Sequence, residues 1–233
     1  MFLPTHNEIA GQPDTAQIVE LGPGRGSLMA DMLHSWAHTM PAMTEFPIHL
    51  VETSPQLRKL QRQRINVTKM TWHDDVQTLP NAALFGVANE FFDALPIDQA
   101  IWRQTAWRHR HVTVTHGTLS LVDGPALTEA ELAAWQISNN QTEMTDGDIA
   151  EYCPAVDPII QQIAGRIACH GGACLVIDYG KNDNFSDTLQ AVAAHKPVDL
   201  FYQPGNADIS HWVDFAALQR AAVSAGARFI GPV

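Results

Sequence analysis

The sequence predicts an α/β fold in which a doubly wound, mostly parallel sheet is covered by helices on both faces. Short apolar runs bounded by turn residues alternate with amphipathic stretches, which is typical of parallel strands joined by helices. A glycine-rich segment, VELGPGRGSL (19–28), directly follows the first of these runs. With 233 residues, 45% of them hydrophobic, the chain can bury a sizeable core. We expect a single domain over 1–233, with an insert at about 100–150.

The first part of the chain supplies four strands and two helices. The expected strands are QIVEL (17–21), IHLVE (48–52), MTWHD (70–74) and ALFGVANE (83–90). Residues 27–40 carry apolar side chains at helical spacing, which predicts an amphipathic helix between the first two strands. A second helix is expected over 54–65 because Ser54 and Pro55 form a typical helix start.

The second part departs from simple alternation. Residues 101–124 alternate with period two around His116-Gly117, which predicts an antiparallel β-hairpin inserted between the fourth and fifth strands. The remaining expected elements are a helix at 154–170, the fifth strand at 173–180, a helix at 214–227 and a strand that starts within 228–233. Because a doubly wound sheet normally closes with one or two further strands, we expect the domain to extend past this sequence.

The charge of the chain argues against nucleic acid as a partner. Lys and Arg total 14 against 25 Asp and Glu, a net charge of −11, so a phosphate backbone would be repelled unless one face were strongly basic. The richest basic cluster, WRQTAWRHRH (102–111), mixes Arg with Trp and His and fits an exposed hairpin better. We also expect no membrane span, because no apolar run approaches the ~18 residues that one needs.

The cysteines, histidines and N-terminus give weaker signals. The three cysteines show no C-x-x-C spacing, which argues for a reducing compartment and favours buried, inert thiols. Residues 1–17 lack the basic, apolar or Arg-rich patterns of a targeting signal, so we expect a cytoplasmic protein. His34 and His38 have a spacing that can bind zinc, but no third ligand follows nearby, and we expect surface histidines and no metal.

The glycine-rich segment has three candidate ligands: a nucleoside triphosphate, a dinucleotide and S-adenosylmethionine (SAM). A phosphate-binding P-loop requires Gly-Lys-Ser/Thr, whereas Gly26 is followed by Ser27 with no lysine. A dinucleotide fingerprint is G-x-G-x-x-G, whereas Gly22, Gly24 and Gly26 form G-x-G-x-G. Glycines at these positions let the backbone approach a ligand without an intervening Cβ.

Acidic residues at three strand ends favour SAM over a dinucleotide. Glu20 ends the first strand, where a carboxylate can bind the ammonium group of SAM. Glu52 ends the second strand, where an acid accepts hydrogen bonds from the ribose hydroxyls, as it also does in NAD enzymes. Asp74 ends the third strand and can accept the adenine amino group; alternatively, it is a solvated turn residue.

The segment ANEFFDALP (88–96) supplies the candidate catalytic residues. It leaves the fourth strand at the edge where open α/β sheets bind ligands. Its polar residues Asn89, Glu90 and Asp93 could orient a methyl acceptor, and carboxylates suit a cationic one, because a guanidinium can be bound bidentately. The alternative is that the two phenylalanines belong to the core and Asp93 caps a helix.

Six motifs together resemble the MidA-like SAM-dependent methyltransferase family. They are VELGPGRGSLMADML, LVETSPQLRKLQ, WHDD, ANEFFDALP, LVIDYG and PGNADISHWVDF. The resemblance implies a Rossmann-like class I methyltransferase fold with Glu20, Gly22, Gly24, Gly26 and Glu52 around SAM. Its mitochondrial members are protein arginine methyltransferases that act in the assembly of respiratory complex I. It therefore implies N-methylation of arginine in a protein substrate, a complex I subunit being one candidate.

The chain also departs from the family pattern. The family carries a longer segment before the glycine loop, with a GDF.TAPE-like motif, whereas sixteen residues precede QIVEL here; the family also continues past GPV with the closing strands. Two alternatives to a protein arginine methyltransferase therefore stay open: a module that holds SAM or a partner without turnover, and a methyltransferase acting on a small molecule.

Overall fold

A computed structural model describes residues 16–67, 69–137, 144–185 and 187–232, and the chain divides into two compact units. The first unit comprises Met1–Phe92, Asp157–Asp178 and Leu218–Val233, and the second comprises Asp93–Val156 and Tyr179–Ala217. The insert expected at about 100–150 falls within the second unit. Residues 1–15, on which most of the leader prediction depends, lie outside the described residues.

The first unit is built on a five-stranded parallel sheet with the strand order β3-β2-β1-β4-β9. Its strands are β1 (Ala16–Leu21), β2 (Ile48–Val51), β3 (Met70–His73), β4 (Ala83–Asn89) and β9 (Gly172–Ile177). Strands β1 and β2 are buried throughout, as is typical of parallel strands covered on both faces, although they also carry the polar residues Gln17, Glu20 and His49. The order reverses between β1 and β4, so the doubly wound parallel sheet predicted from the sequence is confirmed.

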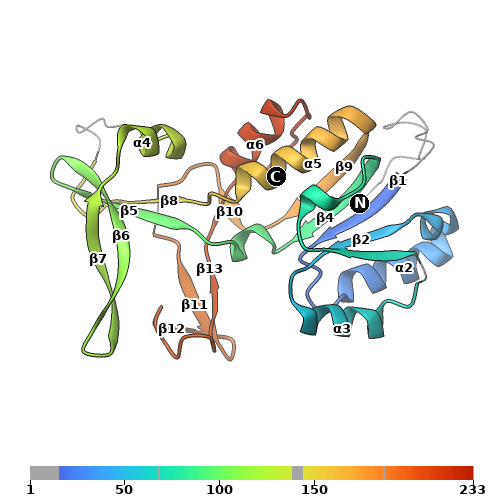
Figure 1. Ribbon diagram of the computed structural model, residues 1–233, viewed down its shortest axis with the longest axis horizontal. Coiled ribbons are helices and arrows are strands. Elements are labelled where there is room, and N and C mark those ends of the chain that lie inside the picture. The colour runs from blue at the N-terminus through green and yellow to red at the C-terminus, as the bar shows by residue number, and fades with distance from the viewer. Residues whose placement is uncertain (1–15, 68, 138–143, 186, 233) are drawn as a thin grey trace. The chain divides into compact units, whose positions relative to one another are not determined.

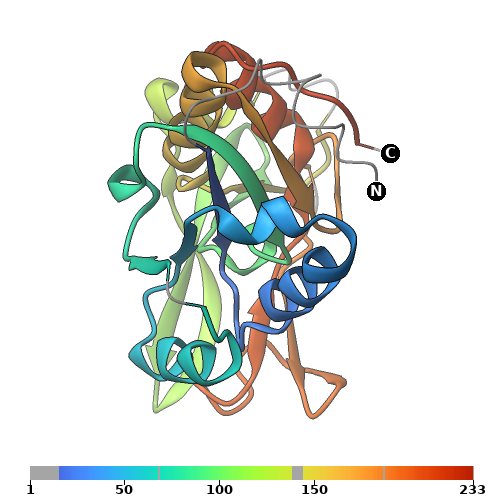
Figure 2. The same cartoon turned by 90° about the vertical axis from the view of Figure 1, so that its right-hand side faces the viewer.

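Helices cover both faces of this sheet. The helices are α2 (Ser27–Thr39), α3 (Pro55–Arg64), α5 (Val156–His170) and α6 (Phe215–Ser224). Helices α2 and α3 lie on one face and α5 lies on the other (Figures 1 and 2). The apolar side of α2 buries Met29 and Trp36 in a cluster with Ile18 of β1 and Leu50 of β2. The four helices predicted from the sequence are thus confirmed to within three residues at each end.

The second unit contains a four-stranded antiparallel sheet with the order β7-β6-β5-β8. Its strands are β5 (Asp98–Arg103), β6 (Ala106–Thr115), β7 (Thr118–Ala126) and β8 (Ile149–Tyr152), and helix α4 spans Glu129–Trp135. The predicted hairpin is confirmed, with its turn at His116-Gly117. Trp102 and Trp107 form the centre of an apolar cluster in this unit.

Short elements complete the chain. The strands are β10 (Gly180–Lys181), β11 (Gln190–Ala193), β12 (Lys196–Val198), β13 (Asp208–Ser210) and β14 (Val213–Asp214). In the second unit, β11 pairs with β12 and β13, and β10 pairs with β14. The 3-10 helices are η1 (Pro41–Glu45), η2 (Val76–Thr78) and η3 (Phe92–Ala94).

Two strand predictions need correction. The expected strand 173–180 ends at Ile177, and Gly180 begins the separate β10. The strand expected within 228–233 is wrong for the described part of that segment, because residues 227–232 have no regular secondary structure. Among the described residues β9 pairs with β4 alone, and residues 227–232 pair with no strand.

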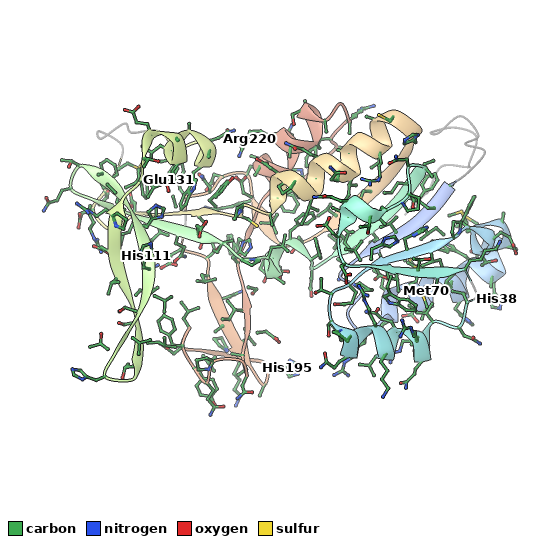
Figure 3. All side chains as sticks on the ribbon, in the orientation of Figure 1. His38, Met70, His111, Glu131, His195 and Arg220 are labelled. Atoms are coloured by element: carbon green, nitrogen blue, oxygen red, sulfur yellow. The ribbon has the colours of Figure 1, made fainter. Side chains whose placement is uncertain are left out.

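The structure places the histidines and cysteines noted in the sequence on separate elements, apart from the neighbouring His34 and His38 on α2. His38 lies on the outer surface of α2, and its ring Nδ1 donates to the carbonyl of His34 at 2.8 Å (Figure 3). Within the described ranges, no three His, Cys, Asp or Glu residues gather to hold a metal.

Burial raises the pKa of the Cys174 thiol to about 12, as expected of an inert cysteine, but Cys169 is exposed, against expectation. No described helix is both long and apolar enough to cross a bilayer.

The packing of β9 against β4 leads to a stability prediction. A Cβ on Gly172 would lie 1.9 Å from the carbonyl oxygen of Leu84, and the residue has φ +116°. We expect Gly172→Ala to destabilise the fold by about 3 kcal/mol or more, lowering the Tm by roughly 6–12 °C. Gly165→Ala in α5 is the control: no described atom lies within 4 Å of its built Cβ, and helix propensity favours alanine. Equal melting temperatures for the two variants in calorimetry would contradict this packing.

Candidate ligand site at the carboxyl end of the parallel sheet

The reversal of strand order between β1 and β4 defines the candidate site. In open α/β sheets, ligands bind beyond the carboxyl ends of the strands at such a point. The chain leaves β1 through the glycine-rich loop and enters α2, and it leaves β4 through Asn89 and Glu90. Within the loop, the Gly26 amide donates to the Pro23 carbonyl at 2.7 Å, and this tight turn brings the N-terminus of α2 to the carboxyl end of β1.

The three loop glycines have positive φ angles but different surroundings. The values are +58° at Gly22, +52° at Gly24 and +75° at Gly26, a region that favours glycine. A Cβ would lie 2.7 Å from the Phe91 ring at Gly22 and 3.0 Å from the Ile65 side chain at Gly26. At Gly24 no described atom lies within 4 Å of that position. Gly22 and Gly26 are therefore needed for packing, and Gly24 is the one that faces open space.

The N-terminus of α2 offers donors to an anion. Gly26 is its N-cap residue, no described side chain caps it, and its first turn holds no acidic residue. The first amide groups of a helix have no partner inside the helix and carry a partial positive charge. This end of α2 suits a carboxylate.

Glu20 is a buried acid at the end of β1. The residue is 3% exposed, and its Oε2 atom has no hydrogen-bond partner among the described residues. Burial raises the pKa of this carboxyl from 4.5 to about 7. A buried polar atom without a partner is costly to the fold, so Glu20 is suited to a cationic group supplied by a ligand.

Glu52, directly after β2, has a fixed carboxylate. Its Oε1 accepts from the amide of Ser54 at 2.8 Å, and its Oε2 accepts from the side-chain amide of Gln61 at 3.2 Å. The residue is 9% exposed. Each carboxylate oxygen can accept a second hydrogen bond, so the pair can receive two neighbouring hydroxyl groups.

Asp74 follows β3 and is already paired. Its Oδ1 accepts from Arg58 at 2.6 Å, and its side chain is 81% exposed. The neighbouring Asp75 caps η2 by accepting from the amide of Gln77 at 2.7 Å. These contacts are those of solvated turn residues, and a bond from Asp74 to adenine stays a prediction.

Asn89 and Glu90 are exposed at the end of β4. Glu90 has φ +47°, uncommon for a residue with a side chain, and its amide donates to the Ile177 carbonyl at 2.8 Å. The next two amides, of Phe91 and Phe92, donate to Asp178 Oδ2 at 3.2 and 3.0 Å. The segment after β4 is thereby tied to the end of β9.

Asp93 belongs to the second unit. The residue is 7% exposed, and its backbone carbonyl accepts from the His211 amide at 3.0 Å. Burial, and with a smaller effect the Asp93 carboxylate, raise the pKa of Tyr179, whose hydroxyl donates to Ser210 at 2.8 Å. The two partners of Asp93, Tyr179 and His211, thus lie in two motifs noted in the sequence, LVIDYG and PGNADISHWVDF.

Two residues of this region were missed by the sequence analysis. Asp178 ties the segment after β4 to the end of β9, but the sequence analysis placed it inside the expected strand 173–180 and gave it no role of its own. Gln61 connects Glu52 to the glycine loop, but a single glutamine in the polar helix 54–65 gives no signal of its burial.

Comparisons with known proteins bear on this arrangement. The chain matches over residues 2–233 a family model described as "Putative S-adenosyl-L-methionine-dependent methyltransferase". It is similar to the protein named protein arginine methyltransferase NDUFAF7, mitochondrial. Identity is 34% to the Xenopus tropicalis protein and 32% to the Homo sapiens protein, over 96% of this chain and 57% and 55% of theirs. The chain thus spans a little over half the length of these relatives.

A solved structure is similar as well. It is a Burkholderia thailandensis protein described as a "likely methyl transferase" and bound to S-adenosyl-homocysteine. The TM-score is 0.74 and the identity 25%, over 91% of this chain and 56% of that one. The mixed α/β fold with a mostly parallel central sheet is shared with this structure.

The comparisons overturn the expected cytoplasmic location. The curated relatives carry the word mitochondrial in their names, which points to mitochondria rather than to the cytoplasm. The expectation depended on local composition at residues 1–17, and such composition does not determine a compartment.

The burial of Glu20 gives a prediction that needs no ligand. Folding raises the pKa of this carboxyl from 4.5 to about 7, because burial disfavours its ionised form. The protonated group therefore leaves the stability of the fold at its full value below pH 4.5, and that stability is lost as Glu20 ionises while pH rises through 7. Glu20→Gln should therefore melt roughly 4–10 °C above the unsubstituted protein at pH 8, with the difference shrinking toward pH 5. Glu45→Gln, a change at an exposed acid, should show no such trend. A pH-independent difference for Glu20→Gln would refute this account of its burial.

Proposed function

The chain belongs to the family of S-adenosyl-L-methionine-dependent methyltransferases whose model it matches, and on that premise we propose that its first unit binds SAM at the carboxyl end of the parallel sheet. The observation that carries the proposal is the buried Glu20 carboxyl, whose Oε2 lacks a partner among the described residues. Glu20 is the last residue but one of β1, the strand that leads into the open turn at Gly24. A ligand with an ammonium group would supply that partner.

The polar groups of SAM match the donors and acceptors at this edge of the sheet. We assign its ammonium to Glu20, its carboxylate to the N-terminus of α2 and its ribose hydroxyls to Glu52. Gly24 leaves room for the ligand, whereas Gly22 and Gly26 hold the loop in shape. Asp74 remains a candidate for the adenine amino group, which would require a rearrangement of its pair with Arg58.

The chemistry that SAM supplies when bound is a methyl group on a sulfonium sulfur, ready for transfer to a nucleophile. We propose that the acceptor is an arginine side chain of a protein, which is supported by the names of the curated relatives. On this assignment, the carboxylate of Glu90 holds the guanidinium and Asn89 orients it, and Asp93 stays a separate candidate for the same role. The nitrogen that takes up the methyl group loses a proton, which an exposed carboxylate such as Glu90 can accept.

A subunit of respiratory complex I as the substrate is a narrower proposal. It rests on the family resemblance of the sequence motifs alone. Incubation with tritiated SAM and a mitochondrial lysate, followed by identification of labelled arginine peptides, tests it. Label in peptides of other proteins, or in a small molecule, would replace this substrate.

Binding of SAM is tested by Gly24→Val. Because no described atom lies within 4 Å of the built Cβ, the valine should disturb the ligand far more than the packing. We expect calorimetric binding and the SAM-induced rise in Tm, both present in the unsubstituted protein, to disappear. Gly205→Val in the second unit is the matched control, since that glycine also has positive φ and open surroundings. A full Tm rise in Gly24→Val would place the ligand elsewhere.

The role of Glu90 is tested by Glu90→Gln, which keeps the shape and removes the charge. Affinity for SAM should stay within about twofold, because the residue is assigned to the acceptor, while methyl transfer to protein arginine falls at least about tenfold. Tritium transfer measures the rate, and Glu129→Gln on α4 controls for the loss of an exposed acid. Equal losses of SAM binding and transfer would move Glu90 into the SAM site. Intact binding without any transfer in the unsubstituted protein would favour the non-catalytic alternative.

A further inference from the structure

The side chain of Gln61 is the most deeply enclosed polar group at the SAM edge of the first unit. The residue lies on α3 and is 0% exposed. Its Nε2 donates to the Gly24 carbonyl at 2.7 Å and to Glu52 Oε2 at 3.2 Å, while its Oε1 accepts from Trp72 Nε1 at 2.7 Å. A buried amide is costly unless it is hydrogen-bonded, and here both of its ends are.

Chemistry fixes the orientation of this amide. An indole N–H is a donor only, so the Gln61 atom that faces Trp72 must be the oxygen. The NH₂ group must then face Gly24 and Glu52, and its two hydrogens serve the two acceptors.

The contacts of Gln61 connect three segments that are distant in the sequence. Gly24 belongs to the loop after β1, Glu52 follows β2, and Trp72 lies in β3. The Ser54 amide holds the other oxygen of Glu52. The Glu52 carboxylate is thus held at both oxygens, and only its remaining lone pairs can accept hydroxyl groups.

We propose that Gln61 is a positioning residue for the cofactor: by holding Glu52 and the Gly24 carbonyl in one arrangement, it sets the selectivity of this site for a ligand with an intact ribose diol. The proposal rests on the proposed binding of SAM. If Gln61 is removed, Glu52 keeps its charge but loses the donor that orients Oε2, so it can rotate. Glu52 would then accept hydrogen bonds from the two ribose hydroxyls less well. The contacts of the ligand's ammonium group with Glu20 and of its carboxylate with α2 would stay.

The test compares ligands that differ by one hydroxyl. S-adenosylhomocysteine and its 2′-deoxy and 3′-deoxy analogues are titrated by calorimetry, so no turnover is needed. The unsubstituted protein should bind the parent roughly ten- to hundredfold more tightly than either analogue, the usual effect of losing a hydrogen bond to a charged group. Glu52→Ala should abolish this ratio and serves as the reference.

The informative variant is Gln61→Met, which keeps the side-chain length and removes the amide. We expect its affinity ratio to fall below about threefold, whereas Gln63→Met, an exposed position on the same helix, should keep the full ratio. Trp72→Phe removes the donor that fixes Gln61 Oε1, together with part of the ring over which Arg62 lies, and it should lower the ratio part of the way. If Gln61→Met does not fold, the affinity ratio of Trp72→Phe tests the proposal in its place.

The outcomes separate the two proposals. A purely structural role for Gln61 would weaken the parent and its analogues alike, so an unchanged ratio in Gln61→Met, or in Trp72→Phe if the first variant is unfolded, overturns the inference and leaves SAM binding intact. Failure of the unsubstituted protein to bind S-adenosylhomocysteine would instead refute the proposed function, and this inference with it.

Discussion

The first unit depends on one constraint, the reversal of strand order beside β1. Because β2 and β4 flank β1 on opposite sides, the chain after β1 turns into α2 on one face, and α5 packs on the other face before β9 (Figure 1). The carboxyl ends of β1, β2 and β4 therefore lie at one edge of the sheet, and a different loop follows each of them. A fixed loop geometry follows, in which Gly26 packs on α3 and Gly22 packs on Phe91, and Gly24 is left toward open space.

One polar group at this edge, the Glu20 carboxyl, opposes stability in the absence of a ligand. Glu20 is desolvated, with its pKa raised to about 7, and its Oε2 has no partner among the described residues. Gln61 and Glu52 are also buried, but they satisfy one another and the neighbouring backbone. The site therefore combines a preorganised acceptor for hydroxyls with one uncompensated acid, and we interpret that acid as the place where binding free energy is gained.

The sequence predicted what local pattern controls. Apolar runs and helix-start signals located the sheet and helices of the first unit, and His116-Gly117 located the hairpin turn. The pattern failed where a strand forms only if a neighbouring strand pairs with it. Residues 227–232 include an apolar run that predicted a strand, but they pair with no strand among the described residues. It also failed where a polar residue is buried by tertiary contacts, as Gln61 is, because nothing in its own helix distinguishes it from exposed Gln63. Acids at strand ends were readable, whereas their hydrogen-bond partners were not.

The central claim is that Glu20 binds the ammonium group of SAM, and the most direct test is calorimetric titration with SAM at pH 6.0 and pH 7.5. With a pKa of about 7, Glu20 is ionised in roughly one-tenth of the free molecules at the lower pH and in about three-quarters at the higher. The account predicts binding that is severalfold tighter at pH 7.5, with net proton release on binding, because the α-amino group of SAM is still mostly protonated there. Equal affinity at the two pH values, or no binding at either, would contradict it.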